Sequence, residues 1–162
     1  MKLLRVSLLV CSIFLLGCQD QNEQILITRN DYHEAMDRLT EVMIHDIFSP
    51  PVASRIYVYP NIAAYEIMAQ DNSNYNSLGG QITDLKAIPK AENELINYNL
   101  AALIAHLEVS KTLVYSKDVM QQYSDSLYTI WSSKNDKEFE ASKNYAMQVA
   151  GHINDWKNTD NY

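Results

Sequence analysis

The middle of residues 94–115 carries six consecutive apolar residues, Leu100-Ala101-Ala102-Leu103-Ile104-Ala105. A helix built from this run has apolar side chains on every side, so it is stable only where other elements surround it. The run therefore predicts a central helix that is buried nearly all round. The chain holds four glycines and four prolines, whereas an all-β fold needs turn residues about every 8–12 positions. The composition thus favours an all-α fold.

Amphipathic helices are predicted before this segment. Residues 31–47 repeat apolar side chains at helical spacing, with Asn30 as the expected N-cap. A second helix is expected to begin at Ser49-Pro50, because serine is a good cap and proline fits the first helical position. We expect this helix to kink or break near Pro60, which cannot donate a hydrogen bond to the carbonyl of Ile56.

Two more helices are predicted after the central one. Ser116 is the expected N-cap of a helix whose apolar face is formed by Val119, Met120, Tyr123, Leu127, Ile130 and Trp131. Residues 135–138 resemble a capping box, and they precede a stripe of Phe139, Ser142, Ala146, Val149, Ile153 and Trp156. The sequence thus predicts an all-α chain of about five helices. The polar linker at residues 71–90 is long for a compact domain, and such loops usually carry a function or pack on a partner surface.

The N-terminus has the pattern of an export signal. Lys2 and Arg5 precede an apolar run that is too short to span a bilayer. The run ends in Leu15-Leu16-Gly17-Cys18, which resembles the cleavage box of bacterial lipoproteins. This resemblance implies a signal peptide at residues 1–17, a lipidated Cys18 with a polar tether over residues 18–30, and a helical region over residues 31–162. It also implies a location in the bacterial cell envelope, lipid-anchored to a membrane and facing the periplasm or the cell exterior.

The charge of the chain limits its partners. The 13 basic and 20 acidic residues give a net charge of −7, and removal of the signal would bring it to about −9. Nucleic acid is therefore excluded as a partner. An oxyanion site needs several convergent cations, but the arginines beyond the signal are widely spaced: Arg29, Arg38 and Arg55. The eleven tyrosines suit interfaces that are apolar in body and polar at the tip, which leaves an oligomer open.

No pattern predicts a catalytic, cofactor or metal site. One helix face carries side chains four residues apart, namely His33, Asp37, Glu41 and His45. A di-metal bundle would need matching elements on other helices, so we expect this face to be solvated. Residues 71–77 lack the glycine of a calcium loop, and residue 82 is not its closing glutamate. Ala150-Gly151-His152 lies inside a helical stripe, so His152 is not expected to be a catalytic histidine. His106 is expected to be a buried histidine bonded to a neighbour.

Residues 45–66 form the most specific stretch of the chain. They read His45-Asp46-Ile47-Phe48-Ser49-Pro50-Pro51-Val52-Ala53-Ser54-Arg55-Ile56-Tyr57-Val58-Tyr59-Pro60-Asn61-Ile62-Ala63-Ala64-Tyr65-Glu66. The stretch resembles the N-terminal helical region of bacterial lipoproteins in the vanadium-dependent haloperoxidase and type 2 phosphatidic acid phosphatase superfamily. Residues 97–103 and 111–116 match in kind, so the resemblance spans about residues 31–162. It implies a partial helical bundle of a larger all-α enzyme.

The resemblance does not carry over any catalytic, cofactor or metal residue. In that superfamily a lysine with Arg-Pro, a Pro-Ser-Gly-His and a Ser-Arg followed by histidine lie in the C-terminal half, and none of these motifs stands in this sequence. The resemblance therefore implies vanadate only together with the missing C-terminal half. It does carry over a structural motif: Ser49, Pro50, Pro51, Ser54, Arg55, Tyr57, Tyr65 and Glu66. A lone buried arginine is costly, so Arg55 is expected to meet a carboxylate, with the missing half as one source.

Two hypotheses of function remain open at this point. The chain is either part of a haloperoxidase-like or acid phosphatase-like lipoprotein, inactive alone, or a stand-alone helical lipoprotein that acts as a binding or scaffold module. The first predicts that residues 94–115 and 52–68 keep partly exposed apolar faces where their partner is absent. The second predicts a closed bundle without such faces.

Overall fold

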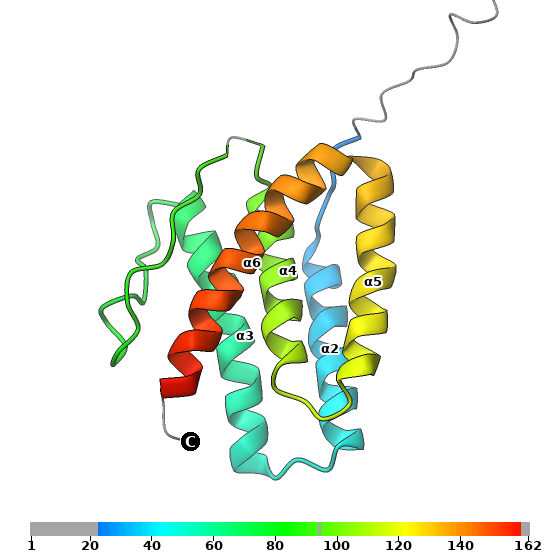
Figure 1. The fold of residues 1–162 in the computed structure, drawn as a ribbon, viewed down its shortest axis with the longest axis vertical. Coiled ribbons are helices and arrows are strands. Elements are labelled where there is room, and N and C mark those ends of the chain that lie inside the picture. The colour runs from blue at the N-terminus through cyan, green and yellow to red at the C-terminus, as the bar shows by residue number, and fades with distance from the viewer. Residues whose placement is uncertain (1–22, 94, 160–162) are drawn as a thin grey trace, which may run out of the picture.

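The computed structural model describes residues 23–93 and 95–159. Their helices are α2 (Arg29–His45), α3 (Pro50–Asp71), α4 (Tyr98–Lys111), α5 (Lys117–Lys134) and α6 (Asp136–Thr159). Successive helices alternate in direction, so α2, α4 and α6 run one way and α3 and α5 the other (Figure 1). The described residues contain no strand, and the prediction of an all-α chain of about five helices is confirmed. None of the described helices is both long and apolar enough to cross a bilayer.

Helix α4 is the centre of the bundle, as the apolar run predicted. It contacts each of the other four helices, most extensively α3 and α6. Ten of its fourteen residues are buried. The helix is shorter than the predicted segment, because Asn97 caps it by accepting a hydrogen bond from the backbone N–H of Leu100. A helix with apolar side chains on every side is stable only where neighbouring elements cover all of its faces, and α4 is covered in this way.

Helix α2 begins two residues before its predicted start. The prediction of Asn30 as N-cap is wrong, because Thr28 takes that place. The Asp31 carboxylate accepts from the backbone N–H of Thr28 at 2.7 Å, and the Thr28 hydroxyl accepts from that of Asp31 at 3.4 Å. The reciprocal pair satisfies two otherwise unpaired donors, which makes Thr28 a better start than Asn30.

Helix α3 runs without a break through Pro60, contrary to the break considered from the sequence. Pro60 is buried together with Tyr59, Ile62 and Ala63. A proline inside a helix costs roughly 3 kcal/mol, and packing of this buried face on α4 offsets the loss. The Asn61 side chain also donates to the carbonyl of Tyr57 at 2.7 Å, which adds a hydrogen bond beside the one that proline removes.

Helices α5 and α6 differ in how well their faces were predicted. The stripe of α6 is buried as predicted, except that its last member, Trp156, is half-buried. On α5, Met120 and Trp131 are buried, whereas Val119 and Ile130 of the predicted face are exposed. Helix α5 lies at the edge of the bundle, where α2, α4 and α6 cover less of its circumference than the pattern implied.

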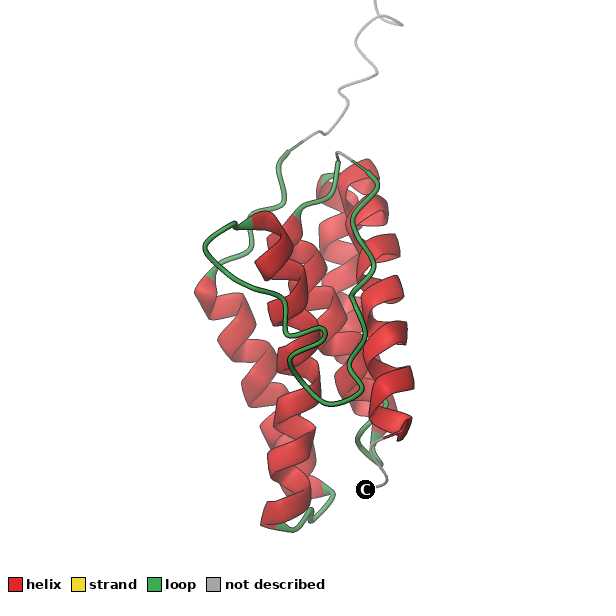
Figure 2. Ribbon diagram, turned by 90° about the vertical axis from the view of Figure 1, so that its left-hand side faces the viewer, coloured by secondary structure: helices red, strands yellow, loops and turns green. Residues whose placement is uncertain are grey.

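The long linker between α3 and α4 packs on the chain itself. It drapes over the side of the bundle, as Figure 2 shows. Leu85 and Ile88 bury their side chains in the core, and the Trp156 indole of α6 donates to the carbonyl of Thr83 at 3.0 Å. The linker therefore serves this fold, and its length does not by itself require a partner surface.

The segment before α2 is also part of the fold. Ile25 is buried in the core, within the stretch that the sequence assigned to a polar tether. Its backbone N–H donates to the Glu138 carboxylate at 3.1 Å, and its carbonyl accepts from the Asn97 side chain at 2.7 Å. Asn97 also donates to Glu138 at 2.8 Å, and its backbone N–H donates to Ser142 at 2.9 Å. One asparagine thus joins the N-terminal segment, α4 and α6.

Replacing Asn97 by alanine should lower the free energy of unfolding by about 2 kcal/mol, because it removes a helix cap and leaves the half-buried Glu138 carboxylate short of a donor. Urea denaturation followed by circular dichroism measures the change. Asn144→Ala on the exposed side of α6 is the matched control, with an expected change within about 0.5 kcal/mol. Equal effects of the two variants would contradict the prediction.

Candidate functional site

The motif residues at the start of α3 shape a helix entry. Ser49 is the N-cap residue, and Pro50 and Pro51 form the first turn, as the sequence predicted. The Ser49 side chain makes no capping hydrogen bond. The Ser54 hydroxyl donates to the carbonyl of Pro51 at 2.7 Å and stays exposed. None of these groups forms a catalytic arrangement, so their role is to start the helix.

The tyrosines of the motif tie α3 to its neighbours. The Tyr57 hydroxyl lies 2.7 Å from the hydroxyl of Thr40 on α2. The Tyr65 hydroxyl donates to the carbonyl of Asn76 in the linker at 2.9 Å. The motif residues are therefore distributed along α3, and they do not converge on one site.

Glu66 is the one motif carboxylate that is fully buried. It accepts a hydrogen bond from the Ser77 hydroxyl at 2.6 Å and one from the backbone N–H of Leu78 at 2.5 Å. Both donors belong to the linker, so Glu66 fastens the linker to the inner side of α3. Its oxygens are engaged within the fold, which gives this carboxylate a structural part.

His106 is buried on α4, as predicted. Its Nε2 lies 3.0 Å from the sulfur of Met36, and its ring meets the Tyr32 ring edge-on at 5.1 Å. Nδ1 has no hydrogen-bond partner. Burial lowers the pKa of His106 to about 4. The imidazole is therefore neutral at neutral pH and enclosed by apolar and aromatic groups, so it has no access to a substrate.

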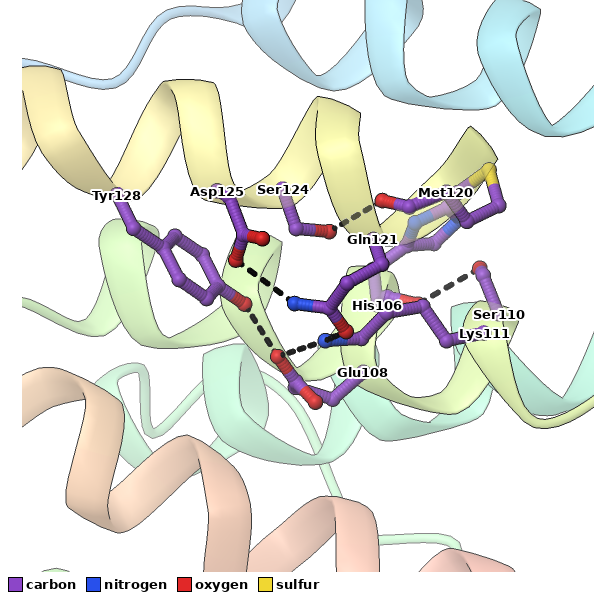
Figure 3. A network of polar contacts seen from close by, with 9 residues as sticks. All are labelled: His106, Glu108, Ser110, Lys111, Met120, Gln121, Ser124, Asp125 and Tyr128. Carbon is purple, nitrogen blue, oxygen red and sulfur yellow. Dashed lines mark hydrogen bonds and ion pairs between the residues drawn. The ribbon is translucent and has the colours of Figure 1, made fainter. Parts of the chain in front are cut away.

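A polar network joins α4 to α5 at the half-buried ion pair of Lys111 and Glu108 (Figure 3). Glu108 accepts from Lys111 at 2.7 Å and from the Tyr128 hydroxyl at 2.6 Å. Lys111 donates to Gln121 at 3.0 Å, and Gln121 donates to Asp125 at 2.7 Å. Burial, and secondly the Glu108 charge, raise the pKa of Tyr128. Each of these groups has a partner, so the network holds two helices together.

The arginines beyond the predicted signal do not share one oxyanion site. Arg38 pairs with Glu41 at 2.8 Å on the α2 surface. Arg55 lies 5.9 Å from the centre of the Tyr59 ring on α3. Arg29 borders a cavity of about 440 Å³ between the start of α2 and the middle of α3. Because an oxyanion needs several convergent donors, these three arginines do not together form a site for vanadate or phosphate.

The metal-site candidates do not assemble either. The row from His33 to His45 lies on a mostly exposed face of α2. Across residues 23–93 and 95–159 no three histidine, cysteine, aspartate or glutamate side chains come together as metal ligands would. His152 lies within α6 and its Nε2 is 3.2 Å from the carbonyl of Lys86, so it also contacts the linker.

Five apolar side chains gather where α2 passes into α3 and α4 into α5, and we call them the end surface: Ile44, Ile47, Phe48, Tyr115 and Val119. The two turns are joined by the Asp46 carboxylate, which accepts from the backbone N–H groups of Tyr115 and Ser116 at 2.8 and 2.9 Å. Phe48 stacks on Tyr115 with ring centres 4.8 Å apart. Ser116 is the N-cap residue of α5, as the sequence predicted, but its side chain makes no capping hydrogen bond and donates to the Asp46 carboxylate instead.

The end surface is the most exposed apolar part of the described chain. Ile47 is 88% exposed, Tyr115 78% and Ile44 72%, and no other large apolar side chain among the described residues reaches these values. Ile47 also has a φ of 57°, in the left-handed region. A β-branched residue in that region is strained by roughly 1–3 kcal/mol. The sequence pattern could not show this surface, because Ile47 and Val119 follow the apolar spacing of core positions in their predicted helices.

The comparison with solved structures finds a close likeness. The chain superposes on the crystal structure of a bacterial vanadium-dependent iodoperoxidase with a TM-score of 0.85 and 56% sequence identity. The match covers 87% of this chain and 35% of that protein, so this chain spans about a third of the length of the iodoperoxidase. No protein-family model matches the chain, and no curated protein does.

Proposed function

We propose that this chain forms part of the helical framework of a haloperoxidase-like protein, because it belongs to the superfamily of the vanadium-dependent haloperoxidases. The observation that carries the proposal is the 56% identity to the iodoperoxidase over 87% of this chain. An identity of this size over nearly the whole chain goes beyond a shared fold. It favours a haloperoxidase-like over a phosphatase-like parent, since the matched structure is an iodoperoxidase.

The groups that would hold vanadate lie, in this proposal, outside the matched third. The arginines of the described region take separate partners, and its acidic and histidine side chains form no ligand cluster. Vanadate is held by cationic side chains and backbone donors in this superfamily, and the three arginines of the described residues do not converge on one such set. We therefore assign this chain a structural part and expect it to be inactive alone.

We further propose that Cys18 carries the lipid anchor and that the protein sits in the bacterial cell envelope. The support is the sequence Leu15-Leu16-Gly17-Cys18, which lies outside the described residues. Mass spectrometry of the protein from bacterial membranes tests this, with Cys18→Ser as the variant that should lose the acyl mass. An unmodified Cys18 would contradict it.

The functional test is a chimera in which residues 23–159 replace the matching stretch of the iodoperoxidase. The chimera should oxidise iodide with hydrogen peroxide only when vanadate is added, and the chain alone should not. Phosphate-ester hydrolysis, measured on the same samples, tests the phosphatase alternative. A folded chimera without iodide oxidation, or a chain that oxidises iodide alone, would overturn the proposal.

One observation favours the alternative of a stand-alone binding or scaffold module. The fragment hypothesis predicted partly exposed apolar faces on residues 94–115 and 52–68; within the first range helix α4 is covered on all sides, whereas Leu95 and Tyr115 on either side of it are exposed. Helix α3 keeps an exposed Val58 and an exposed Met68. If the module stands alone, it should fold cooperatively without the rest of a haloperoxidase, and the chimera should fail.

A further inference from the structure

The end surface has no described segment of this chain lying over it. Its three most exposed members, Ile44, Ile47 and Tyr115, come from two separate turns that Asp46 holds together. Apolar side chains gathered in this way at one end of a bundle mark an interaction site more often than scattered ones do. The left-handed backbone of Ile47 turns an isoleucine out toward solvent at a place where asparagine or glycine would be unstrained.

The position of the end surface argues against a membrane as its occupant. The described chain enters at the opposite end of the bundle, next to the start of α6 (Figure 1). Helix α2 has 17 residues, so it separates the two ends by about 25 Å. A lipid on Cys18 would therefore hold the entry end near the bilayer and turn the end surface away from it.

The size of the end surface argues against a free second copy. Stable complexes between separate proteins use roughly 20–30 residues on each side, and this surface has five apolar members. A segment of the same polypeptide does not lose the translational freedom that a free partner loses, so it can dock on a smaller surface. The last described residue of α6, Thr159, lies at the same end of the bundle as the end surface (Figure 1).

The charge beside the end surface indicates what the occupant carries. Lys157 donates to the Thr112 hydroxyl at 3.1 Å, next to the turn that leads to Tyr115. Burial, and secondly the nearby Lys117, lower the pKa of Lys157. Lys157 at Thr112 and Lys117 at the start of α5 thus place two ammonium groups on either side of Tyr115 in the same turn, which favours a carboxylate on the facing surface.

We infer that the end surface is the docking site for the polypeptide that corresponds to the unmatched two-thirds of the iodoperoxidase, through an apolar patch flanked by carboxylates. The matched stretch covers 35% of the iodoperoxidase, so most of the iodoperoxidase lies outside this bundle and is available to pack on it. The inference rests on the proposed function, and it names the face through which the helical framework meets the rest of the protein.

Hydroxyl-radical footprinting tests the inference, since it reads the exposure of individual side chains. Tyr115 and Ile47 should be labelled at least fivefold more slowly in the chimera than in the chain alone. Ile130 and Met147, which are exposed on α5 and α6 away from this end, are the controls and should be labelled equally in both. The chain alone is measured over a dilution series and with vesicles of phosphatidylglycerol.

The outcomes separate the inference from the proposed function. An active chimera that labels Tyr115 as fast as the chain alone overturns the inference and leaves the proposed function standing. Protection of the chain alone that grows with concentration, or on vesicles, assigns the surface to a second copy or to a membrane and overturns it as well.

A substitution adds a second readout. Ile47→Asn should leave the chain alone at least as stable as before, because the side chain is solvated and asparagine relieves the strain of the left-handed backbone. In the chimera it should restore fast labelling of Tyr115, whereas Ile130→Asn should not. Equal effects of the two variants in the chimera would contradict the docking site.

Discussion

Replacing Glu66 by alanine is expected to lower the free energy of unfolding by about 4 kcal/mol. The carboxylate is fully buried and accepts hydrogen bonds from the Ser77 hydroxyl and the Leu78 backbone N–H. Hydrogen bonds to a charged acceptor contribute roughly 1.5–3 kcal/mol each, and both are lost in this variant. The linker should come loose at the same time, because Glu66 fastens its first part to α3.

Urea denaturation measures the stability change, and limited proteolysis within the linker measures the release. Glu66→Gln keeps the shape and one acceptor oxygen, so it should lose about half as much as alanine. Glu92→Ala, on an exposed linker position, is the control and should change stability by less than about 0.5 kcal/mol. A loss below about 1 kcal/mol for Glu66→Ala would show that the buried carboxylate does not hold the linker.

The second large effect is a loss of stability in mild acid. The pKa of His106 is lowered by burial to about 4, whereas an unfolded histidine has a pKa of about 6.5. As the pH falls through this window, the unfolded chain binds a proton that the folded chain does not. The free energy of unfolding should therefore fall by about 3 kcal/mol between pH 6.5 and 4, and this contribution should be constant above and below that window.

Chemical denaturation at several pH values between 7 and 4 measures the slope. His106→Phe keeps a ring against Tyr32 and removes the titration, so its stability should change by about 3 kcal/mol less over the window. The exposed His33→Gln is the control and should keep the slope of the parent. Although burial acts in the opposite direction, hydrogen bonds from Ser116 and Tyr115 lower the pKa of Asp46. The contribution of Asp46 to the free energy of unfolding is therefore lost only at pH values below the range in which His106 acts. An unchanged slope in His106→Phe would disprove the assignment.

Local patterns were sufficient for the helices of this chain. The apolar run around Leu103 predicted the central helix, and the stripe from Phe139 to Ile153 predicted the buried face of α6. The predicted helix ends were less accurate where two sequence signals for a helix boundary competed. Thr28 prevailed over Asn30 because Asp31 stands three residues after it and completes the reciprocal cap. Pro60 did not end α3 because the helix packs on α4 through that turn.

The candidate site was less predictable. The resemblance singled out Glu66, but nothing in the sequence indicates that its partners are Ser77 and Leu78 in the linker. The end surface could not be predicted from the sequence for a similar reason. Ile47 reads as a core position of a helix, and its exposure depends on where the turn after His45 places it.

The sequence by itself determined the helical class, the order of the elements and the likeness to the haloperoxidases, because these follow from spacing along the chain and from residue identity. Only the tertiary structure decided which polar groups join distant segments. The Glu138 carboxylate meets the backbone of Ile25 across 113 positions, and Asp46 meets Tyr115 across 69. Helical periodicity arises between residues three or four apart. A hydrogen bond between segments exists only after the whole bundle has brought its two ends together.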